Sequence, residues 1–338
     1  MKILIDAFGG DNSPQEVIAG TVAAVKAKKG FTAVLVGNKE LLDVHLSRYG
    51  YPQDRIEILD AKQVITCEEE PTVGIRTKPD STICKAFKEL KDNAEAKAFV
   101  SAGSTGAVLV GATLKLGRIK GVARPALCPV LPTLSGKNVY LIDSGANADC
   151  KPINLCQFAV MGTVYAKAMG VENPKVALLS NGTEDEKGNA LNHEVFPMLK
   201  EMKGINFIGN TEARDILSGD ADVIVADGFS GNVAIKSIEG GVKMVMQALK
   251  DAVYGSLSGK LGGLFLKKRL KKLKDQLDYN KKGGALFIGV NKPVIKAHGS
   301  SKKEAFKNVI LQAVDYAEID FADKITAALN ESGVLSAK

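Results

Sequence analysis

Short apolar runs alternate with glycine-rich polar turns and amphipathic segments along most of this chain. The clearest example is 222–241, where the continuous apolar run 223–226 predicts a strand buried on both faces, as in a parallel sheet. An Asp-Gly pair ends the strand, and apolar positions three and four residues apart then predict a helix. The first N–H groups of a helix lack intrahelical partners and carry partial positive charge, so this junction predicts a phosphate site. Its candidate residues are Asp227, Gly228, Ser230, Gly231 and Asn232.

The same strand–turn–helix unit recurs along the chain. Further strands are predicted over 2–6, 33–36, 56–59, 99–101, 139–142, 176–179, 205–208, 285–290 and 294–296. Helices are predicted from Pro14, over 107–116, 153–169 and 190–200, and as one long helix that 297–301 opens and that runs to about Leu329. This alternation predicts an α/β fold with a mostly parallel sheet, which binds ligands at the carboxyl ends of its strands.

Two more turns carry candidate phosphate ligands. The turn after strand 99–101 combines glycines with hydroxyl side chains, namely Gly103, Ser104, Thr105 and Gly106. Its hydroxyls can bind phosphate oxygens, but capping of the following helix is the favoured explanation for each of them taken alone. The turn after strand 176–179 contributes Asn181, Thr183 and Lys187. Lys187 is expected to contact phosphate or a carbonyl oxygen, with an ordinary surface lysine as the alternative.

Other candidate residues also have structural alternatives. His298 stands just before the last predicted helix and can act as a general acid–base or as a hydrogen-bonded structural residue. Asp6, Asp143 and Asp227 each end or follow a predicted strand, and we expect them to order the loops there. The polar segment 66–80, which two prolines interrupt, is predicted to be a flap.

The segment 240–280 is predicted to form a helical hairpin. An apolar stripe that begins at Val242 and continues to Leu257 changes phase after Gly262-Gly263, so one straight helix cannot bury both parts. The second arm places lysines opposite leucines, which suits an anionic membrane surface, an acidic protein, or packing against a dimer partner. The residues expected to make this contact are Leu264, Phe265, Leu266, Lys267, Lys268, Arg269 and Leu270.

The amino-acid composition excludes several classes of function for this chain. The 338 residues carry a formal net charge of +7, and seven cations without an acid lie within 260–274. The basicity therefore belongs to one segment, and the rest of the chain does not suggest a nucleic-acid surface. Five cysteines without a C-x-x-C pair and three scattered histidines predict reduced thiols and no metal site. No apolar stretch approaches the ~20 residues of a membrane span, so we expect a cytoplasmic protein.

An ordered set of motifs resembles one bacterial family, the phosphate acyltransferases of phospholipid synthesis. The motifs are DAFGGD (6–11), VSAGSTGA (100–107), RPAL (124–127), GAN (145–147), GTEDEKGN (182–189), ADVIVADGFSGNVAIKSIEG (221–240) and VIKAHGSS (294–301). Phe8 replaces a usual Met and Ser104 a common Asn, and both changes keep the loops similar in size. The resemblance covers nearly the whole chain, 1–338, as a single α/β catalytic domain.

This resemblance implies a three-layer α/β/α sandwich like that of the isocitrate and isopropylmalate dehydrogenases. It also implies a cytoplasmic homodimer, peripherally bound to the inner face of the cell membrane. The implied reaction moves a long-chain acyl group from acyl carrier protein to inorganic phosphate, with no metal or cofactor. A membrane glycerol-3-phosphate acyltransferase would then use the acyl phosphate.

Chemistry suggests roles for the candidate residues in such a reaction. A phosphate oxygen attacks a thioester carbonyl, so the site must hold a dianion and stabilise an oxyanion. We expect the backbone N–H groups of 103–106 and 228–232 to bind phosphate. Ser230 and Asn232 are expected to orient the nucleophile, and Lys187 to contact phosphate or the carbonyl oxygen and protonate the leaving sulfur.

Three other functions fit parts of the sequence. A coenzyme A-dependent phosphotransacetylase shares the phosphate chemistry but has no need of an amphipathic hairpin. An NAD-dependent decarboxylating dehydrogenase is disfavoured because no G-x-G-x-x-G follows the first strand. A non-catalytic membrane-surface scaffold that binds acyl carrier protein would not require three phosphate-type turns.

Overall fold

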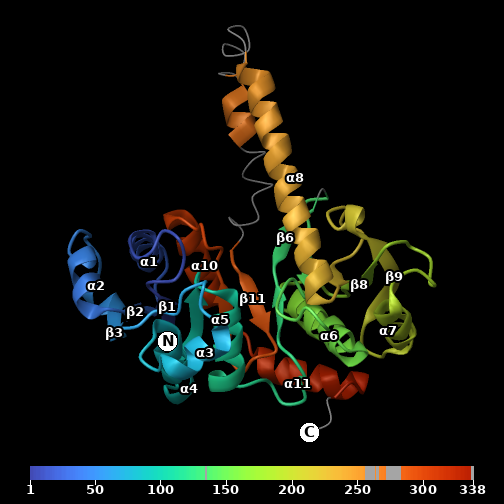
Figure 1. The fold of residues 1–338 in the computed structure, drawn as a ribbon, viewed down its shortest axis with the longest axis horizontal. Coiled ribbons are helices and arrows are strands. Elements are labelled where there is room, and N and C mark those ends of the chain that lie inside the picture. Colours follow the sequence, from blue (N-terminus) through green and yellow to red (C-terminus); the bar gives the residue numbers. More distant parts are fainter. Residues whose placement is uncertain (134, 256–262, 264–265, 272–282, 336–338) are drawn as a thin grey trace.

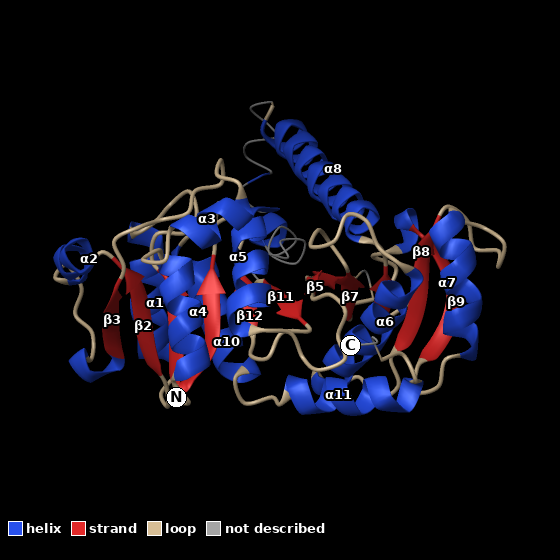
Figure 2. Ribbon diagram, turned by 60° about the horizontal axis from the view of Figure 1, so that its bottom comes forward, coloured by secondary structure: helices blue, strands red, loops and turns tan. Residues whose placement is uncertain are grey.

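Two mostly parallel β-sheets lie side by side and form two lobes (Figure 2). The computed structural model describes residues 1–133, 135–255, 263, 266–271 and 283–335. The sheet of the first lobe has seven strands in the order β3-β2-β1-β4-β12-β11-β5, and that of the second lobe has five, in the order β6-β7-β10-β8-β9. The predicted parallel-dominated α/β class is confirmed, although in two sheets and not in one.

The strands follow the apolar runs of the sequence. Those of the first lobe are β1 (Lys2–Asp6), β2 (Thr32–Gly37), β3 (Ile56–Asp60), β4 (Ala96–Ser101), β5 (Ala126–Cys128), β11 (Ala285–Ile288) and β12 (Val294–Lys296). Those of the second lobe are β6 (Val130–Pro132), β7 (Asn138–Ile142), β8 (Lys175–Ser180), β9 (Asn206–Glu212) and β10 (Val223–Val225). β11 runs antiparallel to both of its neighbours, and β6 runs antiparallel to β7.

Helices cover both faces of each sheet, which explains why the inner strands are apolar, whereas the edge strands β3 and β9 are more exposed. The helices are α1 (Gln15–Ala27), α2 (Lys39–Leu46), α3 (Pro71–Thr77), α4 (Thr82–Asp92), α5 (Thr105–Gly111), α6 (Pro152–Ala168), α7 (Ala190–Glu201), α8 (Gly228–Tyr254), α10 (Lys303–Tyr316) and α11 (Phe321–Ser332). The largest core cluster includes Ile5 from the first sheet and Ile142 and Val176 from the second. The two lobes therefore share one hydrophobic core.

The chain from β5 to β6 joins the two sheets. Leu127 of β5 pairs with Phe287 of β11 in the first sheet, and Val130 of β6 pairs with Tyr140 of β7 in the second. β6 and β7 form a hairpin in which the Thr133 N–H donates to the Lys137 carbonyl at 3.0 Å. A stretch of seven residues, 126–132, thus belongs to both lobes.

Several predicted helix limits are wrong. The long C-terminal helix is two helices, because the chain turns after α10 and the Asp320 carboxylate caps α11 by accepting the Asp323 N–H at 3.0 Å. The first of these two helices, α10, starts at Lys303, after the predicted opening at 297–301. The predicted flap 66–80 contains α3, and there Lys78 forms an ion pair with Glu69 at 2.7 Å.

Helix α8 projects from the body of the protein as its longest described helix (Figure 1). It begins at Gly228, earlier than the sequence suggested, because the Asp227 side chain caps it. It ends at Tyr254, before the predicted break at Gly262-Gly263. Residues 266–271 are helical, and Leu266 is 40% exposed. Leu257, Gly262, Leu264, Phe265, Leu273 and Leu277 lie outside the described residues.

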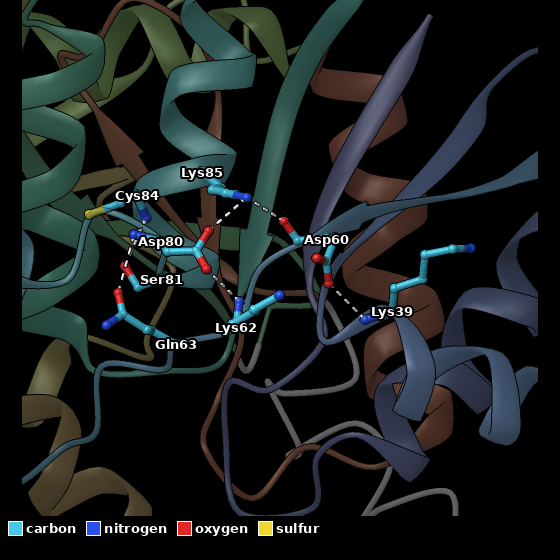
Figure 3. A network of polar contacts seen from close by, with 8 residues as sticks. All are labelled: Lys39, Asp60, Lys62, Gln63, Asp80, Ser81, Cys84 and Lys85. Carbon is cyan, nitrogen blue, oxygen red and sulfur yellow. Dashed lines mark hydrogen bonds and ion pairs between the residues drawn. The ribbon is translucent and has the colours of Figure 1, made fainter.

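A polar network holds the loops at the carboxyl ends of β2 and β3 (Figure 3). Lys85 Nζ forms an ion pair with Asp80 and donates to the Asp60 carbonyl, both at 2.7 Å. The Asp60 carboxylate accepts the N–H of Lys39 at 3.0 Å, and the Asp80 carboxylate accepts the N–H of Lys62 at 3.2 Å. These contacts tie three loops to one another at this edge of the first sheet.

The packing of α8 gives a stability prediction. A Cβ on Gly231 would lie 1.9 Å from the Asp143 carbonyl oxygen, so Gly231→Ala must displace backbone. We expect it to lower the free energy of unfolding by about 1–3 kcal/mol, measured by urea denaturation. Gly240→Ala on the same helix is the matched control, because a Cβ there meets nothing within 4 Å. It should raise the stability by roughly 0.5–1 kcal/mol. Equal effects of the two substitutions would contradict the packing argument.

Candidate active site

A cavity of about 520 Å³ lies between the two lobes. The first lobe lines it with the start of α5, the end of β12 and the loop that follows, and the last turns of α10. The second lobe lines it with β6, β7 and the following loop, the end of α6, and the first turns of α8. This volume falls within the roughly 300–1,000 Å³ of typical ligand sites. We therefore take this cavity as the candidate active site.

Three of the predicted site residues line the cavity, namely Thr105, Asn232 and His298. They come from α5, α8 and the loop after β12, which are far apart in sequence. The structure therefore brings together parts of three motifs that the sequence presented separately. The other predicted residues lie outside the cavity lining, and their local contacts explain why.

The turn before α5 is mostly structural. The Ser104 hydroxyl accepts the N–H of Ala107 at 3.4 Å, so it caps the helix, as the alternative interpretation held. A Cβ on Gly106 would lie 2.6 Å from Pro71 Cγ, which shows how closely α3 covers this turn. Of the four predicted residues in the turn, Thr105 faces the cavity.

A buried carboxylate ties the first loop of the chain to this turn. Asp6 accepts a hydrogen bond from the Ser101 hydroxyl at 2.7 Å, and Ser101 Oγ in turn accepts the Gly103 N–H at 3.0 Å. That N–H, expected to bind phosphate, is thus already engaged within the protein. Burial raises the pKa of Asp6 above its usual value, although the Ser101 hydrogen bond opposes the shift. The sequence-based expectation that Asp6 orders the loops agrees with this geometry.

The first turn of α8 also satisfies its own backbone donors. Asp227 accepts both the N–H of Ser230, at 2.8 Å, and its hydroxyl, at 2.7 Å. The N–H of Gly228 donates to the Asn147 carbonyl at 2.8 Å, and that of Gly231 to the Asp227 carbonyl at 3.0 Å. These three N–H groups are therefore engaged within the protein, contrary to the expected backbone phosphate cradle. The side chain of Asn232, in the next position, lines the cavity instead.

Asp143 organises the loop after β7. Its fully buried carboxylate accepts backbone N–H groups from the loop that follows, with the shortest, from Asn147, at 2.7 Å. It also accepts the N–H of Leu127 at 2.9 Å, which connects β5 to the same carboxylate. Burial raises the pKa of Asp143, and the N–H donors oppose that rise by stabilising the charged form. The loop that results places Ser144 and Gly145 in the cavity wall.

The loop after β8 lies outside the cavity lining. Asn181, Thr183 and Lys187 are exposed, and none of them lines the cavity. The stem of Lys187 covers Gly182, where a Cβ would lie 2.6 Å from Lys187 Cγ. Because β8 pairs in parallel with β10, this loop leaves the same edge of the second sheet as the start of α8. The sheet thus brings the loop near α8 without bringing Lys187 into the cavity.

Lys296 is a cavity residue that the sequence reasoning missed. It ends β12, lines the cavity, and donates from Nζ to the Ala297 carbonyl at 2.6 Å. Burial lowers the pKa of Lys296 to about 8, and the charges of Asp6 and Asp11 only partly oppose the shift. A cation next to a partly buried cavity is suited to a phosphate dianion. The signal that could have identified Lys296 is its place in the motif VIKAHGSS, two residues before His298.

The ring of His298 is oriented by Ser300. Its Nδ1 accepts the N–H of Ser300 at 3.3 Å and lies 2.9 Å from the Ser300 hydroxyl. Because an N–H donates to Nδ1, the proton of the neutral ring belongs on Nε2. This arrangement leaves Nε2–H as the group that His298 can use for proton transfer.

Lys236 is a second cation in the cavity wall that sequence reasoning missed. It lies four residues after Asn232, on the same face of α8, and forms an ion pair with Glu239 at 2.9 Å. The spacing of four residues between Asn232 and Lys236 in the predicted helix could have identified Lys236 as a neighbour of Asn232.

Within the described residues, no cluster of three His, Cys, Asp or Glu side chains could hold a metal ion. Nor is any described helix long and apolar enough to cross a membrane.

The environment of Lys296 gives a direct test. Neutral amines react with acetic anhydride and ammonium groups do not, so competitive acetylation across pH reports the pKa of each lysine. We expect half-maximal labelling of Lys296 near pH 8, against about 10.4 for an unperturbed lysine. Mass spectrometry of the peptide that contains Lys296 provides the readout. A midpoint at or above pH 10 would show that Lys296 is not desolvated.

Comparison with known proteins places this chain in a family. The family model described as "Fatty acid synthesis protein" matches residues 1–324. The phosphate acyltransferase of Clostridium novyi is 47% identical over 332 residues, covering 98% of this chain and 99% of that protein. That of Bacillus cereus is 44% identical over 335 residues, covering 99% and 100%.

Solved structures support the fold. A phosphotransacetylase from Streptococcus pyogenes superposes with a TM-score of 0.61 at 18% identity, covering 96% of this chain and 94% of that one. A 4-hydroxythreonine-4-phosphate dehydrogenase from Klebsiella pneumoniae gives a TM-score of 0.53 at 14% identity, with 94% and 99% covered. At these identities the likeness concerns the fold alone. The sequence relatives decide the family, and the chain belongs to the phosphate acyltransferases.

Proposed function

We propose that this enzyme transfers a long-chain acyl group from acyl carrier protein to inorganic phosphate, giving an acyl phosphate for phospholipid synthesis. The observation that carries the proposal is the cavity between the lobes, where Lys296 and Lys236 are the cations and Thr105 and Asn232 are neutral hydrogen-bonding groups. This composition suits a phosphate dianion that must remain a nucleophile, since Lys236 is already paired with Glu239 and the cavity therefore does not neutralise the dianion fully.

The reaction needs a nucleophile, a place for the oxyanion and a proton for the leaving group. A phosphate oxygen forms a bond to the thioester carbonyl carbon, and the C–S bond then breaks. The proton of hydrogenphosphate ends on the released thiol. His298 Nε2–H is suited to give that proton to sulfur and recover it from phosphate. Asn232 and Thr105 are suited to donate to the developing oxyanion.

The role proposed for Lys187 requires its loop to move toward the cavity. After that movement its ammonium group can contact phosphate or the carbonyl oxygen and protonate the sulfur. Asn181 and Thr183 would then complete the same wall beside Ser230 and Gly231, whose N–H groups stay engaged with Asp227. Glycine at 188, with φ of +120°, and at 182 allows such a loop to change its path.

The proposal includes a fold relationship and an assembly. We infer kinship with the isocitrate and isopropylmalate dehydrogenases from the motifs that this chain shares with the phosphate acyltransferases. The enzyme is proposed to be a cytoplasmic homodimer that binds the inner face of the membrane peripherally. A glycerol-3-phosphate acyltransferase in that membrane would consume the product.

A coenzyme A-dependent phosphotransacetylase is the second candidate. The similarity to the phosphotransacetylase from Streptococcus pyogenes shows a common fold, and a phosphate site would serve either reaction. One assay separates the two. The protein is incubated with phosphate and either palmitoyl-(acyl carrier protein) or acetyl-coenzyme A, and acyl phosphate and free thiol are measured. Product from acetyl-coenzyme A alone would reject our assignment, and product from neither donor would favour a scaffold.

Substitution of Lys296 tests the proposed phosphate site most directly. We expect Lys296→Met to lower kcat/KM for phosphate by about a hundredfold, because it removes one of the two cations that line the cavity, and the other, Lys236, is paired with Glu239. In the wild type, kcat/KM should fall as pH rises through about 8, where Lys296 loses its charge, and this limb should vanish in the variant. Lys26→Met, at an exposed site on α1, is the matched control. An unchanged alkaline limb in the variant would exclude Lys296 as its cause.

Lys187→Ala tests the loop after β8. If the loop closes over the cavity, turnover should fall severely while the thermal unfolding midpoint stays unchanged, because the side chain is exposed. Turnover at the wild-type level would remove Lys187 from the mechanism and leave proton transfer to His298.

Membrane binding is tested separately. We expect the variant Leu266→Glu/Leu270→Glu to lose flotation with anionic liposomes, because both leucines lie on the short helix 266–271 that carries cations. Retained flotation would contradict the membrane role. Loss of acyl transfer from soluble carrier protein with flotation intact would instead assign this helix to carrier docking.

A further inference from the structure

The cavity touches both faces of the second sheet. On β7, Leu141 belongs to the core cluster on the α8 face, while Tyr140 belongs to the main core on the α6 face. Both Ile235 of α8 and Tyr140 nevertheless line the cavity. A single cavity can do this because β6 is the edge strand of that sheet, and Val130 of β6 is also in the wall. The cavity therefore passes around the edge of the sheet.

The part on the α6 face is mostly apolar, with Asn138 and Gln312 as the polar residues that line it. Val130, Tyr140, Met169 and Tyr316 line the cavity and also pack against the main hydrophobic core. The polar residues with chemical roles, Asn232 and Lys296, come from α8 and β12. One cavity thus combines a cationic compartment with an apolar one.

The aromatic wall of the apolar compartment is fixed. Tyr165 stacks edge-on against Tyr140 and Tyr316, with ring centroids 4.8 and 5.6 Å apart. The Tyr316 hydroxyl lies 2.5 Å from that of Tyr165 and accepts a hydrogen bond from Gln312 at 2.9 Å. Because the Tyr316 hydroxyl is satisfied within the protein, this residue presents ring surface to a ligand.

Met169 is the adjustable part of the same compartment. It caps the C-terminus of α6, at φ −93° and ψ 11°, a conformation open to any ordinary residue. Its side chain is partly exposed and unbranched, so it adapts to the shape of an apolar ligand. Substitutions there change the volume of the compartment without disturbing the tyrosines.

We propose that this apolar compartment, formed by Val130, Tyr140, Met169 and Tyr316, holds the acyl chain, and that Met169 limits its length. The inference rests on the proposed acyl transfer and adds where the chain lies. A molecule with a phosphate at one end and a long hydrocarbon at the other matches the two compartments. Each methylene group that becomes buried contributes about 0.8 kcal/mol to binding in general. The wall that ends the compartment therefore also sets the preferred length of the acyl chain.

The test compares donors of different chain length. We measure kcat/KM with octanoyl- and palmitoyl-(acyl carrier protein) for the wild type and for Met169→Trp and Met169→Ala. Met169→Trp should lower the palmitoyl-to-octanoyl ratio by about tenfold or more, and Met169→Ala should not lower it. Met198→Trp, at a 39% exposed position on α7 outside the cavity, is the matched control. Thermal unfolding of each variant confirms that it is folded.

The outcomes separate this inference from the proposed function. Equal loss with both donors, or an unchanged ratio in Met169→Trp, would overturn the acyl-chain assignment while acyl transfer itself stands. No acyl phosphate from the wild type with either donor would instead reject the function on which the inference rests. A palmitoyl donor with a diazirine at its far end gives a second readout. We expect cross-links to the peptide that contains Met169, and cross-links confined to α8 would contradict the proposal.

Discussion

The carboxylate of Asp143 is the contact on which the site depends. It gathers the N–H groups of the loop after β7 and that of Leu127, so one buried charge connects β5, β7 and the turn between β7 and α6. Removing such an acceptor would leave several buried donors without a partner, which costs more than the bonds themselves contribute. The loop it fixes then supports α8, because the Asn147 carbonyl accepts the Gly228 N–H and Gly231 packs on Asp143. Asn232 reaches the cavity through this chain of contacts.

The polar and charged groups of the cavity come from both lobes. The first lobe supplies Lys296 and His298 at the end of β12, and the second supplies Asn232 and Lys236 on α8. Each lobe alone offers an incomplete set of donors and cations. Catalysis in such an arrangement relies on groups held in place before the substrate arrives, which is the main source of electrostatic stabilisation in enzymes.

Sequence patterns predicted the strands well, because a continuous apolar run between turn residues has few other structures open to it. They predicted helix limits less well, since capping by Asp227 and Asp320 depends on single side-chain contacts. The phosphate-type turns were correctly placed at sheet edges. Whether their N–H groups are free depends on partners distant in sequence, such as Asn147 for Gly228. Lys296 was missed because its significance comes from burial, which no local pattern reveals.

The chain 126–132 bears on how the enzyme takes up its substrate. In many two-lobed enzymes a flexible crossing lets the lobes swing apart. Here the crossing is itself paired into both sheets, and Ile5, Ile142 and Val176 share one core across it. A rigid-body opening would separate the two halves of that shared core and expose apolar side chains to water. Substrate entry is therefore an event of loops and side chains, with the two lobes acting as one frame.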